Sequence, residues 1–278
     1  MFSLKKTLQA LAAASLLSAG AAYAGPFILA GTDADDHGFV SSGVNQDGWF
    51  FMQRALENIG AGVTNGNTTV AFLGSTSTAL TAANSAFNLS SLAGVGGWTS
   101  AAISSSDFAD FFNGVGSVNI NNVGILMMDS NGNVGGGVAG SAFVPYASII
   151  NNFVGAGGGL FSQANGYAWL TALLPAVTVT VQQADGLALT AAGNALFPGL
   201  TDADLSAGPH HNFFNNFSPI PVLATRTGTP NQGVAVIIGG TGGSITNPGG
   251  SVPVPGSVAL LGAGLVALGA LRRKSASA

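Results

Sequence analysis

The chain contains no cysteine, and only 6% of its 278 residues are charged. The absence of cysteine excludes a disulfide framework, a thiolate metal site and a cysteine nucleophile. The charged fraction is far below the roughly 25% of an ordinary soluble domain. In contrast, 47% of the residues are hydrophobic, and the chain is long enough to bury a sizeable core.

The few charges are unevenly placed. Five of the seven basic residues lie within the first six or the last seven positions. The stretch from residue 25 to 252 holds the other two, Arg54 and Arg226, against all eleven acidic residues, which gives it a formal charge of −9. A body this acidic is repelled by phosphates, so we expect no nucleic-acid partner.

Residues 1–24 have the pattern of a secretory signal peptide. Lys5 and Lys6 precede an apolar run over residues 8–22, and the sequence at 22–24, Ala-Tyr-Ala, has the small-x-small form that signal peptidase accepts. The alternative is a buried N-terminal helix. We predict that the protein is exported and that the mature chain begins at Gly25.

The last 27 residues, 252–278, combine three features. They are a proline motif, an apolar run of 15 residues over 257–271, and a basic cluster that ends at Lys274. As a helix the run would extend about 23 Å, somewhat short for the ~20 residues of a usual membrane span. The positive-inside rule keeps the basic cluster cytoplasmic. The glycine-rich residues 241–251 are predicted to be a flexible linker. The motif and cluster residues are Val252, Pro253, Val254, Pro255, Arg272 and Arg273.

This C-terminal order resembles the PEP-CTERM sorting signal of Gram-negative bacteria, with Val254 where that family usually has Glu. The resemblance implies that an exosortase, a membrane-embedded cysteine protease, recognises the tail at the inner membrane and cleaves it near Val252–Pro255. It also implies a final location at the cell surface or in the extracellular matrix, associated with exopolysaccharide and biofilm. The alternative is a permanent single-pass anchor.

Between residues 25 and 240, continuous apolar runs are separated by stretches with helical periodicity. Strands buried on both faces and separated by helices predict one α/β domain, a three-layer sandwich with a mostly parallel sheet. Asp47 is predicted to cap a helix over 48–59. Its predicted apolar face consists of Phe51, Ala55, Leu56 and Ile59, and that of the helix over 143–154 consists of Tyr146, Ile149, Ile150 and Phe153. The other predicted helices are 76–87, 105–113, 143–154 and 167–174, and the predicted strands are 26–31, 68–73, 123–128, 157–161, 177–181, 221–225 and 234–238.

The order of elements resembles the class I glutamine amidotransferase-like, flavodoxin-like fold. The cues are a helix over Tyr146–Val154 that runs into Gly157–Phe161, and the stretch from 196 to 213 before a final hairpin. The family motif Gly-x-Cys-x-Gly would fall on 162–166 and place Ala164 at the nucleophile. An alanine methyl group cannot attack a carbonyl, so we expect no amidotransferase activity. Ser162 as a substitute nucleophile is a lesser alternative.

An acidic loop follows the first predicted strand, at the edge of a parallel sheet where ligands bind. Its carboxylates repel one another unless a cation or hydrogen bonds compensate. Oxygen ligands suit Ca²⁺, and a histidine beside them would admit a transition metal. The alternative is a solvated loop whose aspartates cap the next turn. The candidate metal ligands are Asp33, Asp35, Asp36 and His37.

Asp129 begins a second polar loop at the same predicted edge. The sequence Asp129-Ser-Asn-Gly-Asn starts like a calcium loop, but Val134 and Gly140 depart from the EF-hand pattern, which favours a simple turn. His210 and His211 are neighbours that point in different directions, so they do not suit paired ligation of one metal. Asp129 leaves its strand at the same edge as the acidic loop, and only one of the two histidines can face that edge. We therefore predict that Asp129 and His211 share a crevice with the acidic loop.

These patterns lead us to expect a non-enzymatic surface or matrix protein. Two alternatives stay open. One is a metal-assisted hydrolase acting on carbohydrate, with the acidic loop and His211 around one cation. The other is a calcium-dependent glycan-binding module.

Overall fold

The computed structural model describes residues 26–130, 136–164, 166–184, 186–207, 210–229, 231–240 and 242–248. The predicted signal peptide and sorting tail lie outside these residues, so both stay predictions. Within the described part of the chain, no helix has the length and apolarity that crossing a membrane requires. The compact unit of the molecule runs from Tyr23 to Gly250.

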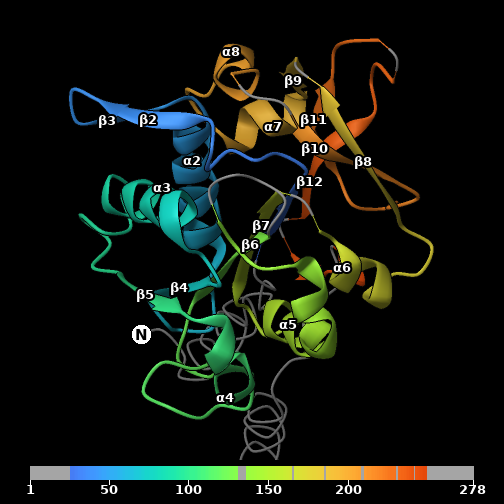
Figure 1. Cartoon of the computed structure of the whole chain (residues 1–278). Helices are drawn as coiled ribbons and strands as arrows, with labels where there is room; N and C mark the ends of the chain where they lie inside the picture. The colour runs from blue at the N-terminus through green and yellow to red at the C-terminus, as the bar shows by residue number, and fades with distance from the viewer. Residues whose placement is uncertain are drawn as a thin grey trace, which may run out of the picture. The chain divides into compact units, whose positions relative to one another are not determined.

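A ten-stranded sheet forms the centre of this unit (Figure 1). Its main path is β5-β4-β6-β7-β1-β12-β10-β8, and the first five strands of that path are parallel. The remaining pairings are antiparallel, and they include β11, which pairs with β12 and β9. The parallel strands are β5 (Thr99–Ile103), β4 (Thr69–Leu73), β6 (Ile125–Ser130), β7 (Gly159–Ala164) and β1 (Phe27–Ala30). The others are β12 (Ala235–Gly240), β10 (His210–Asn215), β8 (Thr178–Ala184), β11 (Val222–Arg226) and β9 (Leu187–Leu189).

Helices cover both faces of the sheet (Figure 1). One face carries α2 (Asp47–Gly62), α3 (Ser77–Asn88), α7 (Ala191–Leu196) and α8 (Asp202–Leu205). The other carries α4 (Phe108–Phe112) after the 3₁₀ turn η1 (Ser105–Asp107), α5 (Ala147–Gly155) after η2 (Gly140–Tyr146), and α6 (Ala168–Leu173). The expected three-layer α/β sandwich with a mostly parallel central sheet is confirmed.

The continuous apolar runs arise because each parallel strand is covered on both sides. Phe72 and Met127 pack toward α2 and α3, whereas their neighbours Leu73 and Leu126 pack toward α4 and α5. Alternate side chains of a strand point to opposite faces, so both faces need apolar residues. The strand predictions for 26–31, 68–73, 123–128 and 157–161 are confirmed in type, with boundaries shifted by one to three residues.

Helix α2 follows its predicted apolar face but not its predicted cap. Phe51, Leu56 and Ile59 are fully buried. The N-cap residue is Gln46, its side chain makes no capping hydrogen bond, and Asp47 lies in the first turn at φ +53°. The Asp47 cap prediction is therefore wrong, because the preceding hairpin sets the backbone where the helix begins.

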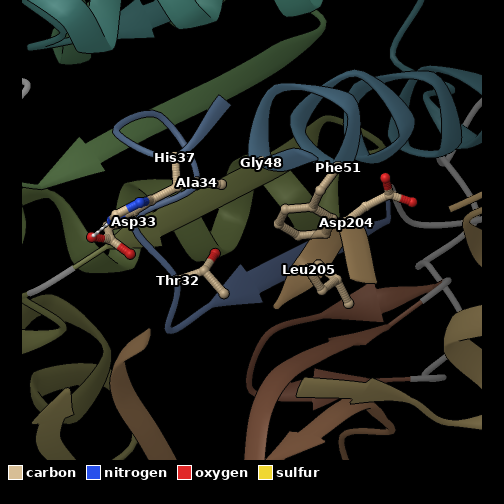
Figure 2. Close-up of a pocket in the computed structure, with 8 residues that line it drawn as sticks. All are labelled: Thr32, Asp33, Ala34, His37, Gly48, Phe51, Asp204 and Leu205. Atoms are coloured by element: carbon tan, nitrogen blue, oxygen red, sulfur yellow. Dashed lines mark hydrogen bonds and ion pairs between the residues drawn. The ribbon is translucent and has the colours of Figure 1, made fainter. Parts of the chain in front are cut away.

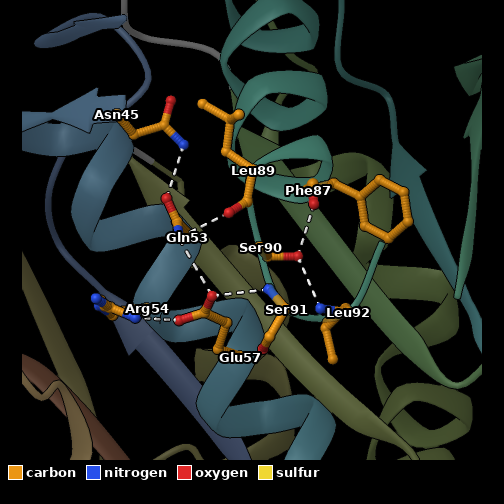
Figure 3. A network of polar contacts seen from close by, with 9 residues as sticks. All are labelled: Asn45, Gln53, Arg54, Glu57, Phe87, Leu89, Ser90, Ser91 and Leu92. Carbon is orange, nitrogen blue, oxygen red and sulfur yellow. Dashed lines mark hydrogen bonds and ion pairs between the residues drawn. The ribbon is translucent and has the colours of Figure 1, made fainter. Parts of the chain in front are cut away.

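That hairpin was not predicted. It consists of β2 (Gly38–Ser41) and β3 (Val44–Gln46), and polar side chains join it to α2 and the end of α3 (Figure 3). Asn45 Nδ2 donates to Gln53 Oε1 at 3.0 Å, and Gln53 Nε2 donates to the Leu89 carbonyl at 3.0 Å. Glu57 accepts from the Ser91 amide at 2.9 Å. The hairpin is thus held on the helices by hydrogen bonds.

A second hairpin, β13 (Gly243–Ser244) with β14 (Asn247–Pro248), lies in the region predicted as a linker. The Thr246 amide donates to Asn151 Oδ1 on α5 at 3.1 Å. Residues 243–248 are therefore part of the packed domain, which corrects the linker prediction at these positions.

Candidate functional site

The carboxyl ends of the parallel strands contain two topological switch points. The adjacent strands β1 and β7 lead to α2 and α6, which lie on opposite faces of the sheet. The adjacent strands β4 and β6 lead to α3 and α5, again on opposite faces. Ligands of open α/β sheets bind in the crevices that such divergent connections leave. This edge is therefore the candidate site.

Asp129, near the end of β6, is the centre of a buried hydrogen-bond network. Ser75 Oγ, after β4, donates to Asp129 Oδ2 at 2.5 Å. Gln163 Nε2, on β7, donates to Asp129 Oδ1 at 2.7 Å. Gln163 is the register partner of Asp129, and both side chains are fully buried. Groups at the ends of three neighbouring strands thus meet at one carboxylate.

The acidic loop after β1 packs onto the first turn of α2. The Gly48 amide donates to the His37 carbonyl at 2.8 Å, and Trp49 Nε1 donates to the Asp35 carbonyl at 2.8 Å. A Cβ at Gly48 would lie 2.3 Å from the Ala34 carbonyl oxygen, so only glycine permits this approach. The alternative of a solvated loop is wrong for Asp35, which is fully buried.

Burial raises the pKa values of the Asp35 and Asp129 carboxyls by different amounts. The pKa of Asp35 is raised to about 8, chiefly by burial and next by the charges of Asp129 and Asp36. Burial also raises the pKa of Asp129, to about 6, although the hydrogen bonds from Ser75 and Gln163 oppose the rise. Burial therefore keeps a proton on this coupled pair of carboxyls to a higher pH than on an exposed aspartate. The charge of Asp129 acts on Asp35, but no described pocket is lined by both, so their shared crevice stays a prediction.

The predicted metal ligands do not form a ready cation cage. His37 Nε2 lies 3.0 Å from Asp33 Oδ2, a hydrogen-bond distance within the loop. Among the described residues, no group of three or more histidine or acidic side chains is placed to hold a metal ion. The Ca²⁺ prediction gains no support from this geometry and stays a prediction.

A small pocket lies beside the loop (Figure 2). Its cavity of about 10 Å³ is close to the minimum for one water molecule. The Thr32 hydroxyl points toward this space, and it is buried without a hydrogen-bond partner among the described residues. The pocket lining includes Thr32, Asp33, Ala34, His37, Gly48, Phe51, Asp204 and Leu205. A buried water or a small ion fits it, whereas a sugar ring does not.

The connection predicted as a nucleophile elbow joins β7 to α6. Strand β7 ends at Ala164, whose side chain lies outside the described ones, and α6 begins at Ala168. Ser162, the substitute nucleophile considered above, is buried. The Tyr167 hydroxyl lies 2.8 Å from the Ala30 carbonyl and 2.9 Å from the Ser162 carbonyl, so it ties the ends of β1 and β7 together.

His210 and His211 lie on β10, next to the end of β1. The Asn212 amide donates to the Gly31 carbonyl at 3.0 Å, and a Cβ at Gly31 would lie 2.0 Å from the Asn212 carbonyl oxygen. The backbone of this strand therefore adjoins the acidic loop. The side chains of His210 and His211 are outside the described ones, so the role predicted for His211 stays a prediction.

Sequence reasoning missed Ser75 as a partner of Asp129, and it considered Gln163 only as part of the elbow. Each is a common polar residue near a strand end, and neither belongs to a recognisable motif. The one available signal was position, since both follow or end strands of the parallel block.

Comparisons of the chain with protein families, with curated proteins and with solved structures give no match.

Proposed function

We propose that the protein is exported, processed at its tail by an exosortase, and retained at the cell surface or in an exopolysaccharide matrix without catalysing a reaction. The pattern at the two ends of the sequence carries this proposal: a basic and apolar leader with Ala-Tyr-Ala at 22–24, and a proline motif, an apolar run and a basic cluster over 252–278. The compact unit, Tyr23–Gly250, ends before the proline motif.

The candidate site supports a binding or structural role more than a catalytic one. A protonated carboxyl beside an ionised one can serve acid–base chemistry. Here, however, Asp35 and Asp129 are both fully buried, and the adjoining pocket has room for about one water. The chain also has no cysteine for the family motif, and its residue 164 is alanine. The hydrolase depends on the placement of the His211 side chain, and the calcium-dependent module depends on Ca²⁺ binding; both stay alternatives.

The sorting proposal is tested in a host with and without its exosortase. An epitope tag inserted at Gly43, in the tight turn between β2 and β3, reports on the body of the protein. We expect a shorter, surface-located product in the normal host and a full-length, membrane-bound product in the deletion strain. Identical mass and location in both strains would refute the proposal.

Two variants make this test specific. Pro253→Ala with Pro255→Ala alters the proline motif, and Arg272→Ala with Arg273→Ala removes two of the basic residues. We expect both variants to accumulate with an intact tail in the normal host. Asn88→Ala, on the surface at the end of α3, is the control and should be processed as the unaltered protein is.

A further inference from the structure

A second hollow in the described part of the chain lies far from the acidic loop, near the amino ends of the parallel strands β4 and β6. It is a groove of about 460 Å³, within the 300–1,000 Å³ of ordinary ligand pockets. Its walls come from the segment before β4, the end of α4, the turn before β6, and α5. The pocket beside the acidic loop, at about 10 Å³, is far smaller. Size therefore favours this groove as the place for an organic ligand.

The lining combines an apolar floor with an amide rim. Ile120 and Ile149 are partly exposed in the groove, and Phe112 and Phe153, which also line it, are nearly covered by their neighbours. Asn67, Asn121 and Asn152 bring amide groups to the same groove, and none of its lining residues is charged. We infer that this groove binds a neutral saccharide segment, with sugar C–H faces on the apolar floor and hydroxyls on the amides.

Several contacts hold the groove in shape before any ligand arrives. Asn67 Nδ2 donates to the Asn121 carbonyl at 3.2 Å, which ties the segment before β4 to the turn before β6. Gly114, at φ +76°, leaves space for the Asn121 amide, because a Cβ there would lie 2.4 Å from Asn121 Nδ2. The Phe112 ring stacks on Tyr146 with centroids 4.2 Å apart. A preformed groove lowers the entropy cost of binding.

The rim amides are available to a ligand. The side-chain amides of Asn121 and Asn152 make no hydrogen bond with another described residue, and both residues are exposed. Each amide offers two donors and an acceptor, which matches the mixed donor and acceptor character of a sugar hydroxyl. An anionic ligand would find no cation here, because neither Arg54 nor Arg226 lines the groove.

This inference rests on the proposed association with exopolysaccharide and names the part of the molecule that makes the contact. Its test is calorimetric titration of the purified exported protein with cellohexaose, maltohexaose and mannohexaose. A hexamer of galacturonic acid, which is negatively charged, serves as the comparison ligand. We expect at least one neutral hexamer to bind and the acidic hexamer to bind at least tenfold more weakly.

Variants locate the binding. Loss of a hydrogen bond between neutral groups typically weakens binding several-fold, so Asn121→Ala and Asn152→Ala should each reduce affinity about five- to tenfold. Asn88→Ala is the matched control, because Asn88 is exposed on α3 on the other face of the sheet, and its affinity should be unchanged. Thermal melts of all three variants should match the unaltered protein.

Three results would overturn the inference. They are no binding of any neutral hexamer, preferred binding of the acidic hexamer, or binding that Asn121→Ala and Asn152→Ala leave unchanged. The titration uses purified protein and does not depend on how the tail is processed. Its failure would therefore leave the exosortase test unaffected, and failure of that test would leave the titration interpretable.

Discussion

The buried Asp35 carboxyl predicts that the protein loses stability as pH rises. Its pKa is raised from 3.8 to about 8 in the folded state, first by burial and then by the charges of Asp129 and Asp36. Between these values the folded state holds a proton that the unfolded chain releases. The stabilising contribution is therefore complete below about pH 4 and is lost as pH rises through about 8.

The size of this effect follows from the width of the pH interval. Each pH unit within it changes the free energy of unfolding by about 1.4 kcal/mol, so the interval from pH 5 to pH 8 corresponds to an upper limit on the order of 4 kcal/mol. That is a large part of the ~5–15 kcal/mol that stabilises an ordinary domain. The pKa of Asp129, raised to about 6, adds a smaller effect of the same sign at lower pH.

Asp35→Asn removes the ionisation while keeping the size and polarity of the side chain. We expect urea unfolding at pH 5 and pH 8 to show a clear loss of stability in the unaltered protein. The variant should lose much less and should be more stable than the unaltered protein at pH 8 by about 2–4 kcal/mol. Asp110→Asn, at an exposed carboxylate on α4, is the control and should keep the original pH dependence. If Asp35→Asn retained the full pH dependence, the reasoning from burial would be refuted.

Three further predictions concern the same edge of the sheet. Ser75→Ala should raise the pKa of Asp129 further and destabilise the protein by about 1–3 kcal/mol at pH 8, with a smaller loss at pH 5, where Asp129 is largely protonated. Urea unfolding at both pH values measures this, and an equal loss at both would contradict it. Gly48→Ala should cost at least about 2 kcal/mol by pushing the Ala34 carbonyl away, whereas Gly94→Ala, whose added Cβ meets nothing closer than 3.9 Å, should be nearly neutral. The calcium prediction expects the melting temperature of metal-stripped protein to rise with added Ca²⁺ and the rise to vanish in Asp35→Asn; no rise at any concentration would contradict it.

The elements that could be predicted are those whose pattern is local. The four apolar strands of the parallel block and the faces of α2 and α5 are confirmed, because a run or a period of apolar residues reflects burial directly. β5 and β10 were not predicted. The sequence of β5, Thr-Ser-Ala-Ala-Ile, is that of a half-exposed edge strand, and β10 begins with two histidines and an asparagine. Such strands form because a neighbour offers unpaired backbone groups, which no local pattern records.

The candidate site, too, could be predicted only where its features are local. The sequence by itself determined that acidic residues follow the first buried strand and that Asp129 closes another, since strand ends and polar loops are local features. Only the tertiary structure decided that Ser75 and Gln163 hold Asp129, and that Asp35 lies buried near it. Those contacts depend on the strand order β4-β6-β7-β1, which brings together residues from four separate segments of the chain. Burial and the repulsion between neighbouring carboxylates then raise the pKa of Asp35, and both are properties of the packed fold.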